Sequence, residues 1–373
     1  MHVPDGFIDA PVSAAAGAVA AGAVAVSLRG ARRELGERAA PLAGLVAAFV
    51  FAAQMLNFPV AAGTSGHLLG GALATILVGP YTGVLCVTVV LLVQGLLFAD
   101  GGLTALGVNI TNMAVVTTVV AYAVCRGLVR VLPRTRRSVT VSAFAAALLS
   151  VPAAAAAFTC FYAVGGTTDV PVGQVLTAMV GVHVLIGVGE AAITALTVGA
   201  VLAVRPDLVY GARDLTAPLR LCVGGEPADA PPSPTLDLAR AGGAPTPALT
   251  PRSPRKVLLA GLAISLLLAG VVSFYASAAP DGLEKAAADE GIEAGAGEHG
   301  AAGSPLADYG VRGITDGRLS GGLAGVIGVG LTVAAGTGVL CTVRIVRTVR
   351  GRRAGEPSPA ATGSPAPRTP RDV

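Results

Sequence analysis

Two short stretches carry the groups in this chain that can bind a metal ion: Met1-His2 and the segment from Gly63 to Gly71. A free α-amino group followed directly by a histidine is a chelator, because the amine, the His2 backbone nitrogen and the His2 imidazole can close two small rings around one ion. One more imidazole would complete a square of four nitrogens, the geometry expected of Ni²⁺, Cu²⁺ and in some cases Co²⁺. His67 is the candidate, since it lies in a glycine-rich break between two apolar runs. Met1, His2 and His67 are therefore the predicted metal ligands.

Ordinary roles are the alternative for both histidines. An N-terminal histidine is usually solvated, and a lone histidine in an apolar run is more often a hydrogen-bonded core residue. The chain has only 4 histidines, at positions 2, 67, 183 and 299, which favours a specific use of them. The amine can be a ligand only if Met1 is kept, and we expect this because a bulky second residue generally blocks methionine removal. We expect no signal peptide, since the first basic residue, Arg29, follows the first apolar run.

Polar residues beside these stretches can orient the ligands by hydrogen bonding. Thr64 and Ser65 stand just before His67, and Asn109 and Asn112 stand near the start of a later apolar run. The same residue types can equally cap or join helices in a membrane. The sequence leaves both roles open for them.

Two ionisable residues, His183 and Glu190, lie deep inside one apolar run. Their spacing puts both on one side of a helix, two turns apart. Placing ionisable residues within a membrane is energetically unfavourable, so their presence calls for an explanation. They can form a path for protons or metal ions, or a buried structural pair, and we favour the structural pair. For His299, in an acidic loop, a relay for metal ions is the alternative to the more common solvated side chain, which we favour.

The composition is that of a membrane protein built from helices. The chain is 53% hydrophobic and only 13% charged, with a mean hydropathy of +0.71, whereas soluble domains carry about 25% charged residues. We predict an all-α, polytopic fold in the lipid bilayer. Its apolar runs lie at about residues 11–28, 41–58, 66–79, 80–99, 103–125, 138–163, 173–204, 256–278 and 320–343. The third is too short to cross a bilayer unless tilted, because a spanning helix needs about 20 residues.

Basic residues predict the orientation. With the N-terminus outside and alternating spans, 23 of the 26 Lys and Arg residues fall in inner loops, as the positive-inside rule requires. Only Lys285, Arg312 and Arg318 fall outside, with twelve carboxylates, and a negative outer face attracts cations. His2 and His67 then share the outer side, as one metal site requires. We expect a multi-pass plasma-membrane protein with its N-terminus outside and its C-terminus in the cytoplasm.

Changes in composition divide the chain into four parts. Residues 1–221 form a seven-span body, and residues 222–255 form a linker rich in Pro, Ala and polar residues. Residues 256–345 form a two-span module with an outer loop, and residues 346–373 form a tail of the same composition as the linker. We expect both the linker and the tail to be disordered on the cytoplasmic side.

The motifs of ATP hydrolysis and of common catalytic sites are missing from the sequence. No Gly-x-x-x-x-Gly-Lys-Ser/Thr loop occurs, and Lys256 and Lys285 are the only lysines. No His-Glu-x-x-His motif is present, and the five cysteines form no CxxC pair. We therefore predict a protein that is not an enzyme, has no cofactor and binds no nucleic acid. Active transport would require an ion gradient or a partner ATPase.

Four motifs together resemble the CbiM/NikM family, the substrate-binding membrane subunits of energy-coupling-factor transporters for cobalt or nickel. The resemblance covers about residues 1–210. The region from about 255 to 345, which begins its outer loop with Pro280-Asp281-Gly282-Leu283-Glu284, resembles the PDGLE (CbiN-like) small subunit, here joined to the permease. The motifs that resemble the permease family are Met1 to Phe7, Gly63 to Gly70, Asn109 to Met113, and His183 to Glu190 with Arg205 to Val209.

The resemblance implies an S-component-like bundle of about seven helices and the same four-nitrogen site. The site would consist of the Met1 amine, the His2 main-chain nitrogen and imidazole, and the His67 imidazole, and its transported ligand would be Co²⁺ or Ni²⁺. The resemblance also implies a transmembrane coupling subunit and two cytoplasmic ATPase subunits as partners. A membrane metal sensor or scaffold that binds without translocating is the alternative. A planar site leans toward nickel on geometry, but the ligand set does not decide between the two metals.

Overall fold

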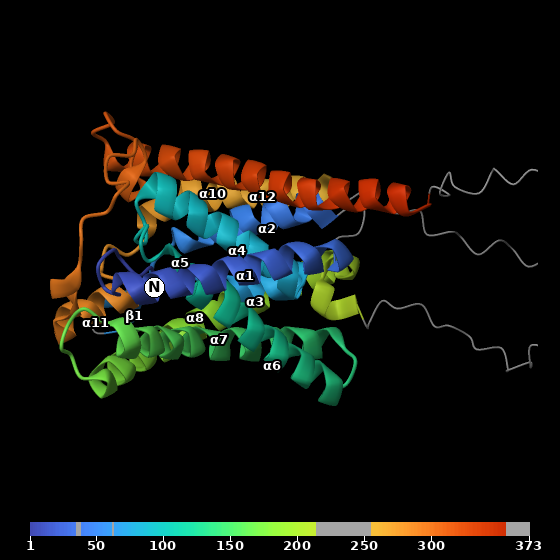
Figure 1. Ribbon diagram of the computed structural model, residues 1–373. Coiled ribbons are helices and arrows are strands. Elements are labelled where there is room, and N and C mark those ends of the chain that lie inside the picture. Colours follow the sequence, from blue (N-terminus) through green and yellow to red (C-terminus); the bar gives the residue numbers. More distant parts are fainter. Residues whose placement is uncertain (35–38, 62, 214–254, 356–373) are drawn as a thin grey trace, which may run out of the picture.

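The computed structural model describes residues 1–34, 39–61, 63–213 and 255–355. Within these ranges the chain forms a bundle of helices with one short antiparallel hairpin, so the all-α prediction is confirmed (Figure 1). The first part of the chain contains α1 (Ala10–Glu34), α2 (Ala39–Gln54), β1 (Phe58–Ala61), β2 (Thr64–Gly66), α3 (Gly71–Val78), α4 (Pro80–Val93), α5 (Leu106–Asn109), α6 (Thr117–Val131), α7 (Arg136–Gly165) and α8 (Val172–Val204). The second part contains α10 (Arg255–Gly270), α11 (Gly282–Glu290) and α12 (Gly317–Gly355).

Seven of the described helical segments are long and apolar enough to cross a membrane. They correspond to seven of the nine apolar runs, and α10 and α12 account for the two of them in the C-terminal module. The second run forms α2, which has 16 residues, and in the third run only the 8 residues of α3 are helical. The multi-pass membrane architecture is therefore confirmed, with two runs shorter than a full spanning helix.

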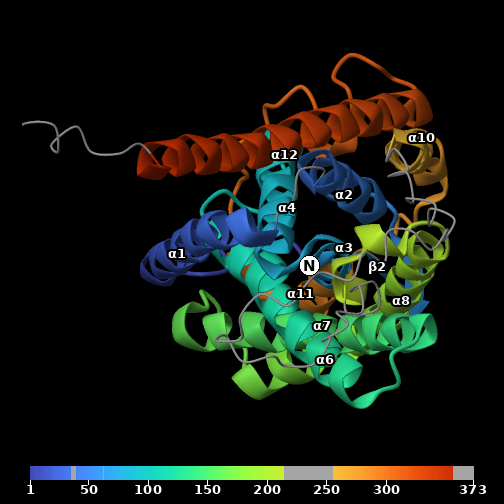
Figure 2. The same ribbon diagram turned by 90° about the vertical axis from the view of Figure 1, so that its right-hand side faces the viewer.

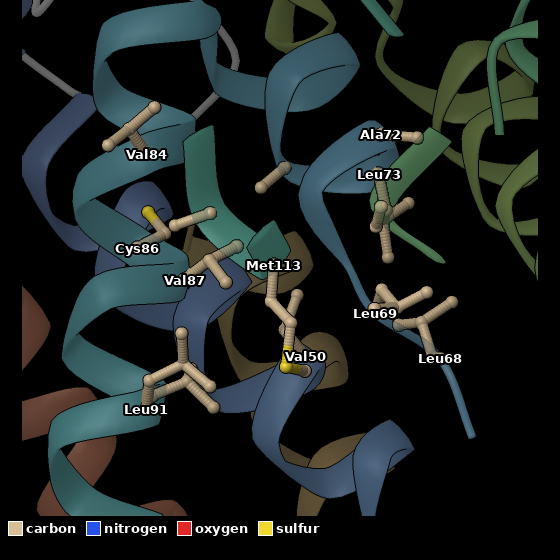
Figure 3. Packing of buried hydrophobic residues seen from close by; sticks show 14 of the residues in the cluster. Val50, Leu68, Leu69, Ala72, Leu73, Val84, Cys86, Val87, Leu91 and Met113 are labelled. Atoms are coloured by element: carbon tan, nitrogen blue, oxygen red, sulfur yellow. The ribbon is translucent and has the colours of Figure 1, made fainter. Parts of the chain in front are cut away.

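The third run is an extended segment followed by a short helix, α3. The segment begins at His67, which contacts Met1, and it ends near Tyr81 and Thr82, whose backbone N–H groups donate to the carboxylate of Glu34. Every residue of α3 is buried, as are Leu68 and Leu69, which lie among core side chains of neighbouring segments (Figure 3). Non-helical backbone at this depth is tolerated because it is enclosed in protein and is not exposed to lipid.

Charged residues separate between the two ends of the bundle. The end that holds Met1, which we call the Met1 end, also carries the segment 276–316, drawn in orange in Figure 1. The opposite end, which we call the Glu34 end, carries basic residues at the ends of helices and in the turns between them. Among the described residues these are Arg29, Arg32, Arg33, Arg126, Arg130, Arg134, Arg136, Arg137, Arg205, Arg213, Arg255 and Lys256.

Small residues let the C-terminal module pack closely on the first part of the chain. Gly44 of α2 leaves no room for a Cβ beside Thr337 of α12, and Gly328 of α12 leaves none beside Phe51 of α2. Close approach of helix backbones through glycine is typical of helix packing in membranes. The module therefore lies directly against α2, with α10 and α12 beside it (Figure 2).

Two boundaries of the predicted parts can be compared with the helices. Helix α12 continues to Gly355, so its last turns extend past residue 345, where we place the start of the tail. The predicted linker 222–255 lies outside the described residues except for Arg255, which begins α10. The tail beyond Gly355 also lies outside the described residues.

Candidate metal centre

The first nine residues precede α1 and form part of the Met1 end of the bundle. Met1 is 3% exposed and Val3 is fully buried. The side chain of Asn109 holds the backbone of Val3 on both sides: the Val3 N–H donates to Asn109 Oδ1 at 2.7 Å, and Asn109 Nδ2 donates to the Val3 carbonyl at 3.0 Å. Asn109 thus positions the chain next to the predicted ligand His2, and it does so through the backbone of Val3. Asn112, one turn later, is buried with both of its amide atoms unpartnered.

Further bonds hold the segment after Val3. The Asp5 carboxylate accepts from the backbone N–H and the hydroxyl of Thr104, at 2.7 and 2.5 Å. Gly6 has φ +87°, and a Cβ there would collide with the carbonyl of Gly295, so this position requires glycine. The Pro-Asp-Gly part of the opening motif therefore holds the N-terminus at a defined depth.

The N-terminal amine meets His67. Met1 N lies 2.6 Å from His67 Nε2, and His67 Nδ1 lies 3.0 Å from the Leu68 carbonyl. Only a protonated Nδ1 can donate to that carbonyl, so the lone pair of Nε2 faces the amine. A metal-binding histidine usually has its second ring nitrogen fixed in this way. Two nitrogens at right angles around one ion, each about 2.0 Å from it, would lie about 2.8 Å apart, which is close to the observed separation.

His2 lies beside the same group but is turned toward a carboxylate. Its ring stacks on His67 with centroids 5.1 Å apart, and its Nδ1 lies 3.1 Å from Asp100 Oδ1. Its Nε2 is buried without a partner. Burial lowers the pKa of His2 to about 4, so the ring is neutral near pH 7. The ring nitrogen that can close a chelate with the His2 backbone nitrogen is Nδ1, and it must leave Asp100 to do so.

The structure adds a residue that sequence reasoning missed, Asp281 of the C-terminal module. Its Oδ2 lies 2.7 Å from Met1 N and 3.4 Å from His67 Nε2. Burial by itself raises the pKa of the Asp281 carboxyl, but the Met1 ammonium holds that pKa well below its usual range. The available signal was Asp-x-x-Glu, a helix-capping pattern. It predicts a helix start, and it does not predict a contact with residues far away in the sequence.

The hairpin β1–β2 brings Asp281 to His67. The backbone N–H of Ser65 donates to the Pro280 carbonyl at 2.8 Å, and its hydroxyl donates to the Ala279 carbonyl at 2.7 Å. Thr64 is buried and pairs with Ala61 in the hairpin. Ser65 therefore joins the segment before His67 to the segment before Asp281, which is a positioning contact through backbone and not a hydrogen bond to a ligand imidazole.

Glu190 and His183, both on α8, lie close to the segment that contains His67. Both Glu190 oxygens accept backbone N–H groups directly after His67, from Leu69 at 2.7 Å and Gly70 at 3.1 Å. Glu190 thus holds the extended segment at the start of α3. His183 Nδ1 lies 2.7 Å from the Met179 carbonyl, and its buried Nε2 has no partner. His183 lines a closed space with Met1, His67 and Asp281 that is too small for a water molecule.

Two residues of the long loop of the C-terminal module contact Asp100 and its neighbour Gly101. We predicted a solvated His299, but its side chain is half-buried. Its Nε2 donates to the Gly101 carbonyl at 3.0 Å, and its Nδ1 accepts from the Ala301 N–H at 2.9 Å. The Tyr309 hydroxyl donates to Asp100 Oδ2 at 2.5 Å. Burial and the adjacent carboxylate raise the pKa of Tyr309 well above its usual range, so its hydroxyl remains a donor.

An open cavity of about 1040 Å³ lies at the Met1 end and reaches His2, His67 and Asp281. It lies between the first part of the chain and the C-terminal module. Carboxylates of both parts line it: Asp100, Asp281, Glu284, Asp308 and Asp316. These five carboxylates outnumber the one arginine of the lining, Arg318, so the cavity favours cations.

Comparison with known proteins gives two family matches, one in the first part of the chain and one in the second. Residues 2–208 match CbiM, described as a cobalt uptake substrate-specific transmembrane region. Residues 255–345 match the PDGLE domain.

Individual relatives match the first part of the chain. A putative metal transport protein of Haloquadratum walsbyi is 41% identical over 210 residues, which are 56% of this chain and 94% of that protein. The putative fused nickel transport protein NikMN of Archaeoglobus fulgidus is 42% identical over 211 residues, 56% of this chain and 68% of that protein. A solved structure of a truncated transition metal transporter has 27% identity and a TM-score of 0.48, over 54% of this chain and 99% of its own.

Proposed function

The chain belongs to the CbiM family of cobalt uptake substrate-specific transmembrane regions, and from this premise we propose that it captures Co²⁺ or Ni²⁺ for an ATP-driven importer. The resemblance predicted from the motifs is confirmed, and the chain is a membrane transport protein for cobalt or nickel. The proposed site consists of the Met1 amine, the His2 backbone nitrogen and imidazole, and the His67 imidazole. The observation that carries it is the 2.6 Å contact between Met1 N and His67 Nε2.

Capture proceeds by replacing protons with the ion. An ion that enters the acidic cavity meets the Met1 amine, which must lose its proton before it can be a ligand. The His67 Nε2 lone pair is already directed at that amine. The His2 ring then exchanges Asp100 for the ion through Nδ1, and the His2 backbone nitrogen completes the square when its proton is displaced. Asn109 holds the Val3 backbone throughout, so the position of the preceding residue, His2, is fixed.

The charge separation supports import with the Met1 end outside. The basic Glu34 end suits the cytoplasmic side, and the acidic cavity at the Met1 end suits capture from outside. We propose that residues 1–221 are the permease, that residues 256–345 are a PDGLE module, and that the linker and tail lie in the cytoplasm. Because the sequence has no phosphate-binding loop, we assign the energy source to partners, a transmembrane coupling subunit and two ATPase subunits.

Reconstitution will separate this function from the alternative of a metal sensor or scaffold. We expect vesicles that contain the chain with its coupling and ATPase subunits to accumulate ⁵⁷Co²⁺ or ⁶³Ni²⁺ when ATP is supplied, and vesicles that contain the chain alone to bind the ion without accumulating it. The measurement is the radioactivity that vesicles retain on a filter, before and after a chelator is added to the outside medium. Binding that never becomes chelator-resistant in the complete complex would favour the sensor or scaffold.

Asn109 and Asn112 form a matched pair for testing the N-terminal clamp. Asn109→Ala removes two hydrogen bonds to Val3 and should weaken metal affinity by about tenfold, the lower range for loss of an outer-shell partner. Asn112→Ala removes an amide without a hydrogen-bond partner and should leave the affinity unchanged. Isothermal titration of both variants checks this, and equal losses in the two would contradict a role of the clamp.

A further inference from the structure

We propose that Asp281 is a ligand of the transported ion, so that the PDGLE module completes the site. This inference rests on the proposed function and deepens it, because it adds an oxygen donor to the four nitrogens. Its basis is the position of Asp281 Oδ2 against two of the proposed ligand atoms, the surroundings of that oxygen and the charge of the site.

Three donor atoms form a compact triangle. Met1 N and His67 Nε2 are 2.6 Å apart, Met1 N and Asp281 Oδ2 are 2.7 Å apart, and Asp281 Oδ2 and His67 Nε2 are 3.4 Å apart. Three mutually perpendicular ligands at about 2.0–2.1 Å from one ion form a triangle with edges of about 2.9 Å. The observed edges average near this value, so one ion can contact all three atoms after shifts of a few tenths of an ångström. Asp281 then lies above the plane of the nitrogens.

The Asp281 carboxylate is held with one oxygen free for the site. Its Oδ1 accepts the N–H groups of Leu283 and Glu284 at the start of α11, at 2.7 and 2.9 Å. The Glu284 carboxylate in return accepts the Asp281 N–H at 2.8 Å, and Ser65 holds the carbonyls of the two preceding residues. Fixed ligands of this kind are typical of metal sites, in which a ligating carboxylate is itself hydrogen-bonded.

The charge of the buried site also requires an anion. Met1 and His67 are 3% and 5% exposed, and Asp281 is 7% exposed. A dication bound by three neutral nitrogens and one deprotonated backbone nitrogen would leave one positive charge in this poorly hydrated place. Burying an uncompensated charge is strongly unfavourable. The Asp281 carboxylate makes the ion and its ligands neutral. When the ion binds, its charge takes the place of the Met1 ammonium as the partner of this carboxylate.

An oxygen above the plane alters the metal preference. A planar set of four nitrogens favours Ni²⁺, whereas a fifth donor suits Co²⁺, which takes higher coordination numbers readily. We therefore expect Asp281 to raise the affinity for Co²⁺ more than the affinity for Ni²⁺.

The test compares Asp281→Asn with Asp308→Asn in the full chain. Asparagine caps a helix as well as aspartate does, so Asp281→Asn keeps the Oδ1 contacts and turns an amide without a lone pair toward the site. Asp308 lines the same cavity and has φ 54°, a conformation that asparagine tolerates, so Asp308→Asn removes an equal charge without touching the ligands. Asp281→Ser, which retains a capping oxygen, serves if the asparagine variant does not fold. The readouts are the visible d–d spectrum of the Co²⁺ form and the affinities for Co²⁺ and Ni²⁺.

We expect Asp281→Asn to change the Co²⁺ spectrum and to lower Co²⁺ affinity by at least about tenfold, with a smaller loss for Ni²⁺. Asp308→Asn should keep the wild-type spectrum. A Co²⁺ spectrum that is unchanged in Asp281→Asn overturns this inference alone, even if both affinities fall, because the carboxylate would then act only through its charge. A wild-type chain that binds neither ion overturns the proposed function as well.

Discussion

A chain with two residues inserted between Met1 and His2 will lose its bound Co²⁺ or Ni²⁺, while both imidazoles remain. A single inserted residue is unsuitable, because a free amine, two backbone nitrogens and a histidine at the third position can by themselves bind Ni²⁺ in a plane. The insertion separates the amine from the His2 backbone nitrogen and enlarges the small chelate ring. Asn109 keeps Val3 in place, so the amine is moved by up to about 7 Å, two residues along the chain. Its contacts with His67 and Asp281 are then lost. Since outer-shell changes alone weaken metal sites by about 10–100-fold, we expect a loss greater than about 100-fold.

Metal content per chain, measured after purification and dialysis, checks this expectation. The control is an insertion of the same length beside Gly303, which is exposed and where a side chain would meet no other atom. The control should retain about one ion per chain, and its metal analysis will also identify the ion. Equal metal content in both insertions would move the site away from the N-terminus and make His183, with its free buried Nε2, the next candidate.

The second large effect is expected for Glu190→Ala, a substitution in the middle of α8. The alanine leaves two buried N–H groups, those of Leu69 and Gly70, without their acceptor. Each unsatisfied buried donor destabilises by about 1–3 kcal/mol, so for two donors we expect a loss of about 2–6 kcal/mol in the free energy of unfolding. His67 lies just before these two residues, and we therefore expect metal binding to fail together with the local structure.

Thr194→Val is the matched control for Glu190→Ala. Thr194 lies one turn further along α8, is fully buried and has an unpartnered hydroxyl, so its replacement by an isosteric apolar side chain should not destabilise. Thermal unfolding in detergent and Co²⁺ titration measure both effects. If Glu190→Ala unfolds like wild type and binds Co²⁺ normally, Glu190 does not hold the segment, and a role in an ion path regains weight.

The arrangement of Met1, His2 and His67 illustrates how far local sequence reaches. The chelating ability of an amine followed by histidine is a property of two adjacent residues, and it can be read without any fold. The proximity of His67 was predicted from topology, because positive charges in alternate loops put both histidines at one end of the bundle. The two stretches do meet there, although His2 is turned to Asp100, a contact that no sequence pattern indicated.

Positioning roles needed the tertiary structure. Asn109 and Asn112 are the same residue type, one helical turn apart in one motif, and the sequence treated them alike. Only the path of the first nine residues decides that Asn109 meets a backbone while Asn112 does not. Glu190 was predicted as one of a structural pair with His183, and its partners are instead two backbone N–H groups of the segment after His67.

The sequence by itself determined the membrane class, the helical fold, the separation of charge and the family, because hydropathy, basic-residue placement and contiguous motifs are properties of composition and neighbouring residues. For the third apolar run, the sequence indicated only that it is too short to span a membrane, and it did not predict the extended segment before α3. The contact of Asp281 with the site was decided by tertiary structure alone. It joins residues that are 280 positions apart, and it depends on the docking of the module against α2 and on the pairing of Ser65 with Ala279 and Pro280. Such distant contacts depend on how helices pack, and no local pattern encodes that.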